Sequence, residues 1–189
     1  MVSTEIIAKL PSVLKPISDE KDGNAAVSLL LKPRLGDVDL LLVKRVENPR
    51  DTWSGQMALP GRKREPKDLS LKNTAVRETL EETGVSFTNC QVLGVLDALR
   101  SEPRSNLAIL PLVVLLKYEP RLKLNKEEPE TFVWVPYEKV VQSKGTVQLG
   151  FGKVSAYIFA EGTVWGITHD ILTKFIQAVE ATQTCNNSL

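Results

Sequence analysis

Cysteine and histidine are scarce in this chain of 189 residues, which argues against a disulfide-rich protein and against thiol catalysis. It has two cysteines, Cys90 and Cys185, which cannot build a disulfide framework and are not spaced like metal ligands. Neither has a histidine near it in the sequence, so thiol catalysis is unsupported. The single histidine, His169, lies away from every carboxylate motif and is interpreted as structural. A reducing cytoplasm is the simplest setting for such a chain.

Net charge and long apolar runs are also lacking. Twenty-four basic residues face 23 acidic ones, so no global field recruits nucleic acid or an anionic membrane. The most apolar stretch, residues 107–116, is too short to span a bilayer. The first ten residues lack the pattern of a signal peptide. We therefore expect a small-molecule partner, and neither nucleic acid nor a membrane.

The composition that remains is typical of a globular protein. Apolar residues make up 42% and charged residues 25% of the chain. Its length is enough for one domain with a core but marginal for two. We expect a single domain over residues 1–189, with an N-terminal extension at 1–22 and a polar tail at 182–189.

Two kinds of periodicity alternate along the chain. A short helix before Pro11 is followed by an exposed segment that continues through Gly23. Residues 47–64 are expected to form a loop, and Trp134 and Trp165 to lie in the core. Strands are predicted at 25–31 and 38–45, which form a hairpin, and at 91–97, 107–117, 131–135 and 154–159. Helices are predicted at 74–83 and 165–181. The layout predicts an α/β sandwich with one mixed β-sheet between helices.

Three carboxylates share one side of the first long helix. At 100° per residue, Glu78, Glu81 and Glu82 lie within an arc of about 100°. We expect this face to open to a cleft, while the opposite side around Val76 and Leu80 is buried. Like charges at this spacing repel and need a counter-charge, which Mg²⁺ or Mn²⁺ would supply. An ordinary solvated helix face accounts for the same residues, so the flanking sequence decides.

The flanks turn the helix into a recognisable motif. Residues 61–85 resemble the Nudix box, G-x5-E-x7-R-E-U-x-E-E-x-G-U, where U is a bulky aliphatic residue. The second half matches except at Thr79, where the pattern has an aliphatic residue. In the first half the plain spacing fails, because the Gly position falls on Lys63 and the first Glu position on Leu69. A local insertion explains this shift.

A subfamily with a longer loop restores the register. Its pattern, P-G-G-K-x-D-x-x-D-x-S-x3-T-A-L-R-E, is that of coenzyme A pyrophosphatase-like proteins, and residues 60–78 are similar to it with Arg62, Glu65 and Val76 as departures. Residues 55–61 and 164–168 are similar to two further segments, G-Q-V-A-F-P-G and I-W-G-L-T. Trp53 stands near a position where that subfamily has a histidine.

The resemblance implies a Nudix-type α/β/α sandwich and a Mg²⁺-dependent pyrophosphohydrolase, with Mn²⁺ as a substitute. Glu78 and Glu82 would be the principal metal ligands, and Glu81 would bind metal or orient water. The backbone of Gly61 would add a carbonyl ligand. Arg77 would hold a neighbouring glutamate in place.

Other residues are assigned beside these. The resemblance implies a general base on a later loop glutamate, for which Glu128 is the choice, with a solvated acidic turn before a strand as the alternative. Arg62, Lys63 and Arg64 are candidates for binding the diphosphate, with a solvated charge run as the alternative. Trp53 would stack on an adenine ring or anchor its loop.

Several functional alternatives stay open at this point. The substrate is expected to be coenzyme A or a derivative, with ADP-ribose, dinucleotides and oxidised nucleotides as alternatives. A non-catalytic nucleotide sensor would be expected to have lost one of the three carboxylates. RNA decapping is disfavoured by the near-neutral charge. A homodimer, common among Nudix proteins, is left open.

Overall fold

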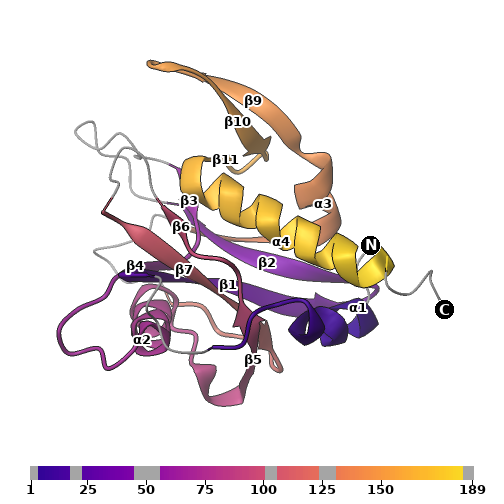
Figure 1. Cartoon of the computed structure of the whole chain (residues 1–189). Helices are drawn as coiled ribbons and strands as arrows, with labels where there is room; N and C mark the ends of the chain where they lie inside the picture. Colours follow the sequence, from indigo (N-terminus) through magenta and orange to yellow (C-terminus); the bar gives the residue numbers. More distant parts are fainter. Residues whose placement is uncertain (1–3, 18–22, 45–55, 101–105, 124–130, 185–189) are drawn as a thin grey trace.

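A mixed β-sheet forms the middle layer of the fold (Figure 1). The computed structural model describes residues 4–17, 23–44, 56–100, 106–123 and 131–184. At the centre of the sheet, β1 (Ala25–Arg34) and β7 (Ala108–Leu116) run parallel, and the other pairs are antiparallel. The order is β3 (Met57–Ala58), β2 (Asp37–Lys44), β1, β7, β5 (Cys90–Val95), while β4 (Gly61–Lys63), β6 (Leu99–Arg100) and β8 (Thr131–Pro136) pair with β1, β7 and β2.

Helices cover both faces of this sheet. In Figure 1, α2 (Leu71–Thr83) lies on one face, whereas α1 (Thr4–Lys9), α3 (Tyr137–Gln142) and α4 (Gly166–Thr184) lie on the other. A second sheet of β9 (Lys144–Leu149), β10 (Gly152–Ile158) and β11 (Thr163–Trp165) stands beside α4. Two short 3-10 helices, η1 (Leu10–Ser12) and η2 (Phe87–Asn89), complete the described elements. The predicted α/β sandwich is confirmed.

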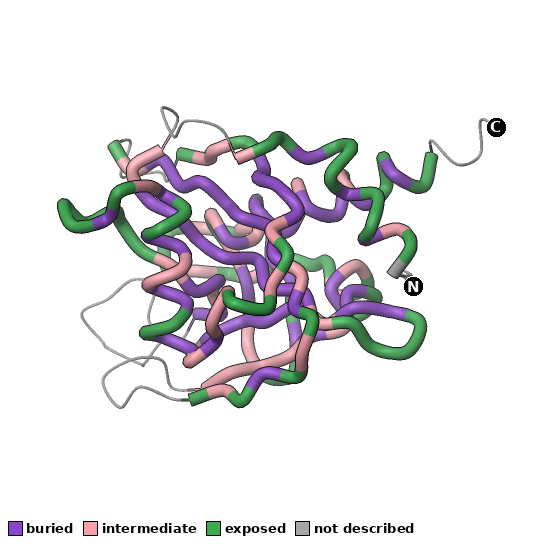
Figure 2. The backbone as a smooth tube through the Cα atoms, turned by 90° about the horizontal axis from the view of Figure 1, so that it is seen from below, coloured by how far each residue is buried: buried purple, intermediate pink, exposed green. Residues whose placement is uncertain are grey.

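Strand β1 is buried on both faces of the sheet, which explains why its sequence is almost continuously apolar. Val27 and Leu29 alternate with Ala26 and Leu30 along this strand, and the two sets belong to different hydrophobic clusters. One cluster packs under α1 and α4 and the other under α2. Figure 2 shows the buried residues concentrated along the strands in the middle of the molecule. A strand that is buried on both faces has no polar alternation.

The predicted loop at 47–64 contains two short strands in its described part. Strand β2 pairs with β1 only over Leu31–Arg34, and β4 occupies the same edge of β1 over Ala25–Val27. β1 and β2 therefore separate, and β3 and β4 lie in the opening. The loop prediction was wrong for β3 and β4. Pro60 and Gly61 are residues typical of turns, so the local sequence predicts a loop, whereas these short strands form by pairing with β2 and β1, which are distant in the sequence.

The N-terminal segment is anchored in the core by two apolar side chains. Ile7 and Leu10 are 0% exposed and pack in the cluster that contains α4. Lys15 forms an isolated antiparallel bridge with Val95. Of the described residues after the predicted helix, Pro11, Ser12, Val13, Lys15 and Pro16 are exposed as expected, and Leu14 is buried. The predicted hairpin, the other four strands and both long helices are confirmed within a few residues, but α3, β9 and β11 were not predicted. None of the described helices meets the length and apolarity needed to cross a membrane.

Candidate active site

Helix α2 carries the predicted carboxylates and is capped at both ends. It begins three residues earlier than predicted, because the Ser70 side chain accepts a hydrogen bond from the Asn73 N–H at 3.0 Å. It ends at Gly84, whose φ of 74° is left-handed and whose N–H donates to the Leu80 carbonyl at 2.9 Å. These local signals fix where the carboxylates stand on the helix.

The face of α2 that is buried is not the one expected. Glu78 and Glu82 are only 2% and 9% exposed, whereas Leu80 is 50% exposed and Val76 is intermediate. The prediction that the apolar side is buried and the acidic side opens to a cleft was wrong. The side chains of Glu78 and Glu82 point toward β4, where the Gly61 N–H and the Arg62 guanidinium contact them. Burial of a charged group requires such partners.

Thr79, which stands where the Nudix box has an aliphatic residue, lies on the buried side. Its Oγ1 donates to Ser28 Oγ on β1 at 2.7 Å, and both residues are 0% exposed. The pairing satisfies two hydroxyls between helix and sheet. A hydrogen bond therefore replaces an apolar contact at this position.

Gly61 brings backbone close to the buried glutamates. Its φ is 141°, and a Cβ at this position would lie 2.2 Å from the Ala26 carbonyl oxygen and 2.5 Å from the Val27 Cα. Only glycine fits such an approach. The Gly61 N–H donates to Glu82 Oε2 at 3.2 Å. This contact holds one carboxylate against the start of β4.

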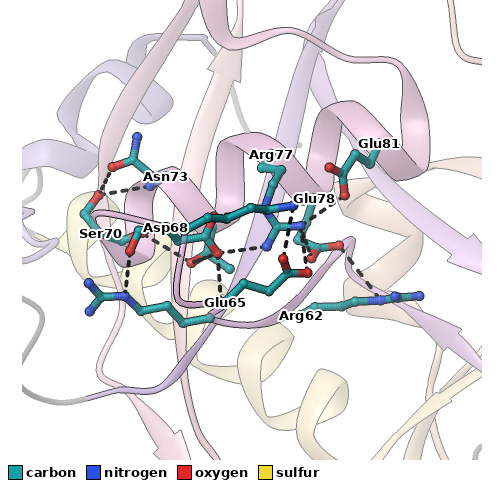
Figure 3. Close-up of polar contacts among 11 residues, drawn as sticks. Arg62, Glu65, Asp68, Ser70, Asn73, Arg77, Glu78 and Glu81 are labelled. Atoms are coloured by element: carbon teal, nitrogen blue, oxygen red, sulfur yellow. Dashed lines mark hydrogen bonds and ion pairs between the residues drawn. The ribbon is translucent and has the colours of Figure 1, made fainter.

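Two arginines neutralise the carboxylates (Figure 3). Arg77 Nη1 lies 2.6 Å from Glu78 Oε1 and 3.0 Å from Glu81 Oε2. Arg62 Nε lies 3.8 Å from Glu78 Oε2 and 3.8 Å from Glu82 Oε1. The counter-charge that the sequence assigned to a metal is therefore supplied by arginine in this arrangement. An excess of negative charge does not by itself distinguish an enzyme from a sensor.

Asp68 is a site residue that sequence reasoning did not single out. Its carboxylate accepts from Arg77 Nε at 2.9 Å and Nη2 at 2.8 Å, from the Glu65 N–H at 3.0 Å and from Thr74 Oγ1 at 3.0 Å. The hydrogen bonds from Arg77 hold the pKa of Asp68 far below its usual range, and the same pair raises the pKa of Arg77. The bidentate pair fixes the Arg77 guanidinium in one orientation.

A sequence signal for Asp68 existed. The longer-loop pattern has an aspartate at this position, while the plain spacing of the box placed the first acidic residue at Leu69. Leu69 is 87% exposed and Asp68 is 5% exposed. The inserted residues shift the acidic position by one, and the contact with Arg77 shows what Asp68 does there.

The three predicted diphosphate-binding residues point to different places. Arg62 reaches the glutamates of α2. Lys63 is paired with Ala25, whose side chain belongs to the cluster on the α4 face of the sheet, so its own side chain is directed away from α2. Arg64 donates from Nε to the Asp68 carbonyl at 3.1 Å and from Nη2 to the Leu69 carbonyl at 2.9 Å, and so binds its own loop.

The two tryptophans expected in the core are partly exposed. Trp134 lies under Lys32, whose Nζ is 4.8 Å from the ring centroid. Trp165 packs against Phe151 with ring centroids 5.9 Å apart. Its backbone carbonyl accepts a hydrogen bond from Gln56 Nε2 at 2.6 Å. This bond joins the two segments outside the box that resemble the coenzyme A pyrophosphatase-like subfamily.

Two assigned residues, Trp53 and Glu128, lie outside the described residues. Among the described residues Cys90 is a free thiol, and burial raises its pKa, which keeps it protonated. His169 packs on Tyr157 with centroids 5.0 Å apart, in keeping with a structural role.

The donor set suits a hard divalent ion without being closed around one. In the described part of the chain, no three Asp, Glu, His or Cys side chains are arranged to hold a metal ion. Glu81 is turned to Arg77, but Glu78 and Glu82 stand one turn apart beside Gly61. Mg²⁺ commonly takes only one or two protein carboxylates and completes its shell with water and phosphate oxygens. Two buried carboxylates fit that requirement.

Comparisons with known proteins agree with this geometry. The family model of the NUDIX domain matches residues 23–155. An uncharacterized Nudix hydrolase NudL from Photorhabdus laumondii is 31% identical, over 91% of this chain and 92% of its own. Another NudL, from Yersinia enterocolitica, is 32% identical over 74% of this chain and 73% of its own.

Solved structures show the same fold at lower identity. A MutT/nudix family protein from Enterococcus faecalis aligns with a TM-score of 0.55 and 18% identity, over 94% of this chain and 70% of its own. A C. elegans Ap4A hydrolase aligns with a TM-score of 0.54 and 13% identity, over 87% and 99%. The sequence match, the mixed sheet and the glutamate-bearing helix beside Gly61 lead to one conclusion. The chain belongs to the Nudix family and is a Nudix-type hydrolase, a class that acts on diphosphate linkages of nucleoside diphosphate derivatives and uses divalent metals.

Proposed function

We propose that this protein is a Mg²⁺-dependent pyrophosphohydrolase that splits the diphosphate linkage of coenzyme A or one of its derivatives. The observation that carries the proposal is the buried pair Glu78 and Glu82, one helical turn apart and facing Gly61. Burial of two carboxylates costs desolvation free energy. Their burial beside β4 therefore favours a functional site over an ordinary solvated helix face. The proposed compartment is the reducing cytoplasm, which rests on the cysteine content alone.

The roles proposed for the residues follow from their contacts. Glu78 and Glu82 would hold Mg²⁺, with the Gly61 carbonyl as a further ligand. When bound, Mg²⁺ would neutralise charge on the diphosphate and lower the pKa of the attacking water. Glu81, 50% exposed in its side chain, would bind metal or orient water.

Arg77 would act as a positioning residue in this reaction. Its contact with Glu78 at 2.6 Å fixes the rotamer of that carboxylate, and Asp68 fixes Arg77 in turn. Glu128 would accept the proton of the attacking water, and Trp53 would contact the base. Lys63 and Arg64 remain proposed contacts of the diphosphate. The Lys63 side chain would have to turn from the other face of the sheet, and the present bonds of Arg64 to its own loop would have to break.

Support for coenzyme A comes from the segments outside the box. Residues 55–61 and 164–168 both resemble the coenzyme A pyrophosphatase-like subfamily, and the Gln56 to Trp165 hydrogen bond places them in contact. Because the two segments contact each other, both can contribute to one substrate-binding surface. ADP-ribose and other nucleoside diphosphate derivatives are the alternative substrates.

A substrate panel with purified protein and Mg²⁺ tests this choice. Coenzyme A, ADP-ribose, a diadenosine polyphosphate and an oxidised nucleoside triphosphate would be compared by kcat/KM. We expect coenzyme A to give the highest value and 3′,5′-ADP with 4′-phosphopantetheine as products. Much faster cleavage of ADP-ribose would overturn the coenzyme A assignment, and no Mg²⁺-dependent cleavage of any of them would overturn the whole proposal.

The alternative of a nucleotide sensor is tested by Glu82→Gln. An enzyme should lose at least about 100-fold in kcat, because the amide cannot replace an anionic metal ligand. The matched control is Glu119→Gln, which removes the charge of an exposed glutamate that pairs with Lys32. It should keep its turnover. A sensor would bind nucleotide and show no Mg²⁺-dependent turnover in the wild type.

A further inference from the structure

Trp165 lies where the second sheet meets the central one, and it is partly exposed. Its backbone carbonyl accepts a hydrogen bond at 2.6 Å from Nε2 of Gln56, a residue that is only 7% exposed. The residue before β11 packs closely on β3, because a Cβ at Gly162 would lie 2.8 Å from Met57 Cγ. Strand β11 is therefore held in place against β3 and the residue that precedes it.

The segment that holds Trp165 leads directly to the proposed metal site. Gln56 stands five residues before Gly61, whose N–H donates to Glu82 at 3.2 Å. Five residues span at most about 18 Å even when they are fully extended. In Figure 1, β4, β11 and the start of α4 all lie toward the left end of the molecule. A substrate whose diphosphate lies at Glu82 can therefore extend toward Trp165.

Phe151 adds an exposed aromatic ring to this surface. It lies in the turn between β9 and β10, is 70% exposed, and packs on Trp165 with ring centroids 5.9 Å apart and planes at 55°. Strand β11 pairs with Ala156–Ile158 of β10, whereas β9 pairs with Gly152–Tyr157, so the tip of the hairpin projects beyond β11 (Figure 1). Aromatic rings at this distance attract each other. Trp165 thus orients a ring that is open to solvent.

The chemistry around Phe151 indicates the kind of ligand that this ring suits. Lys153 is exposed and is the only charged residue in the sequence between Gly145 and Ala160. An exposed ring with one positive charge near it in the chain suits a molecule that combines a flat aromatic ring with negative charge. A nucleotide has both features, and bases stack on aromatic side chains through their π-faces.

We propose that Phe151, oriented by Trp165, stacks on the base of the substrate and is a specificity-determining residue. This inference rests on the proposed function, because coenzyme A or another nucleoside diphosphate derivative supplies the base. A base has two faces, so this contact leaves one of them for Trp53. The link through Gln56 sets the distance between the Phe151 ring and Glu82. It thereby selects substrates whose base lies at that distance from the diphosphate.

The test is nucleotide binding, measured by titration calorimetry with 3′,5′-ADP and with pyrophosphate as a base-free probe, both in Mg²⁺. In Phe151→Ala, the Kd of 3′,5′-ADP should rise at least about fivefold, because the base loses its stacking partner, while that of pyrophosphate should stay within about twofold. Phe151→Tyr should restore the binding of 3′,5′-ADP. Equal losses for the two probes, or no loss for 3′,5′-ADP, would overturn the inference.

Ile158→Ala is the matched control for these variants. It removes another apolar side chain, 47% exposed, from the far end of the same strand. Its Kd for each probe should stay within about twofold of the wild type. A loss of 3′,5′-ADP binding as large as that of Phe151→Ala would show a general effect of the hairpin and contradict the stacking role.

Steady-state kinetics with coenzyme A supply a second readout. Phe151→Ala should lower kcat/KM at least about fivefold, mainly through KM, because stacking binds the substrate and the transition state alike. A fall confined to kcat would indicate a disturbed catalytic geometry and overturn the base-binding role.

A measurement on the wild-type protein covers the case in which the variant does not fold. The indole N–H resonance of Trp165 in a ¹H–¹⁵N spectrum should move when 3′,5′-ADP is added and much less with pyrophosphate, while that of Trp134 on β8 should move little. Equal responses of the two indoles would overturn the inference. If the wild type hydrolyses coenzyme A but neither Phe151 nor Trp165 shows this dependence on the base, the inference fails and the proposed function stands. If neither probe binds and nothing is hydrolysed, both fail.

Discussion

At the scale of single residues, Asp68 shows how a buried carboxylate organises its surroundings. Four donors from Arg77, Thr74 and the Glu65 backbone converge on it. The strength of these bonds is reflected in its lowered pKa. Since Arg77 in turn holds Glu78, the position of a metal-site glutamate depends on a residue ten positions earlier in the chain.

Asp68→Asn is expected to lower the free energy of unfolding by about 3 kcal/mol at neutral pH, because it breaks the buried bidentate pair with the Arg77 guanidinium. Urea denaturation measures the change. Glu65→Gln is the control, since Glu65 is half exposed and lies 3.6 Å from Arg77. It should change the stability by less than about 1 kcal/mol. Equal losses in the two variants would mean that the bidentate pair has no special role.

The same carboxylate makes stability depend on pH. Its pKa is lowered in the folded protein, so the unfolded chain takes up the proton first as the pH falls. The stabilisation is complete above the unfolded pKa of about 3.9 and is lost as the pH falls below it toward the folded pKa. Between about pH 2 and 4, the unfolding free energy of the wild type should fall more steeply with acidification than that of Asp68→Asn. Parallel curves would contradict this assignment.

Gly61 lies close to the backbone of β1 and also donates a hydrogen bond to Glu82. Gly61→Ala is expected to cost more than about 2 kcal/mol and to abolish most activity, because the new Cβ collides with the Ala26 carbonyl and displaces the N–H that Glu82 accepts. Gly150→Ala is the control, since a Cβ there meets no atom within 4 Å. Thermal unfolding and steady-state turnover would be compared. A fully active, stable Gly61→Ala protein would refute this role.

At the scale of elements, helix α2 and the N-terminal segment illustrate two outcomes of local prediction. The end of α2 at Gly84 followed from the sequence, since a left-handed cap is a local property. The packing of Leu10, at the start of η1, against α4 did not, because a contact between the two ends of the chain leaves no local signal. Leu10 is 0% exposed.

Leu10→Ala is therefore expected to cost about 2 to 4 kcal/mol, through lost burial and the cavity that it leaves. Val13→Ala, at a residue that is 38% exposed in the same segment, should cost less than about 1 kcal/mol. Chemical denaturation of both variants makes the comparison. Similar small effects would show that the N-terminal segment contributes little to the stability of the fold.

At the scale of the whole molecule, the separation of β1 from β2 creates the place where the site is built. Strand β4 fills part of the opening and presents Gly61 and Arg62 to helix α2. The helix is attached to the sheet by a buried hydrogen bond between Thr79 and Ser28 as well as by apolar contacts. The alignment of α2 with β4 thus depends on packing between layers.

Thr79→Val tests this attachment. It removes the hydroxyl donor to Ser28 in a fully buried position, and we expect a loss of about 1 to 3 kcal/mol. Addition of Ser28→Ala should recover part of that loss, because the orphaned hydroxyl is then absent. Denaturation of the two single variants and the double variant gives the coupling free energy. Strict additivity would show that the two hydroxyls do not interact.

The family, the order of most elements and the spacing of Glu78, Glu81 and Glu82 could be predicted from the sequence alone. These are properties of short stretches, in which caps, periodicity and motif register act over a few residues. The tertiary structure decided that Glu78 and Glu82 are buried and that Leu80 is exposed, the reverse of the amphipathic expectation. Hydrophobicity alone predicts the apolar face inward. The acidic face is buried instead because the Gly61 N–H donates a hydrogen bond to Glu82 and because Arg62 and Arg77 place positive charge beside the glutamates.

The role of Asp68 and the direction of Arg62 have the same origin. The longer-loop pattern marks the position of Asp68, but its role follows from its pair with Arg77, nine residues away, and the direction of Arg62 follows from the pairing of β4 with β1. Partners that are distant in sequence leave no periodic trace along the chain. The chemistry of the candidate site could therefore be predicted from residue types and spacing, whereas its electrostatic balance required the contacts between β4, the loop after it and helix α2.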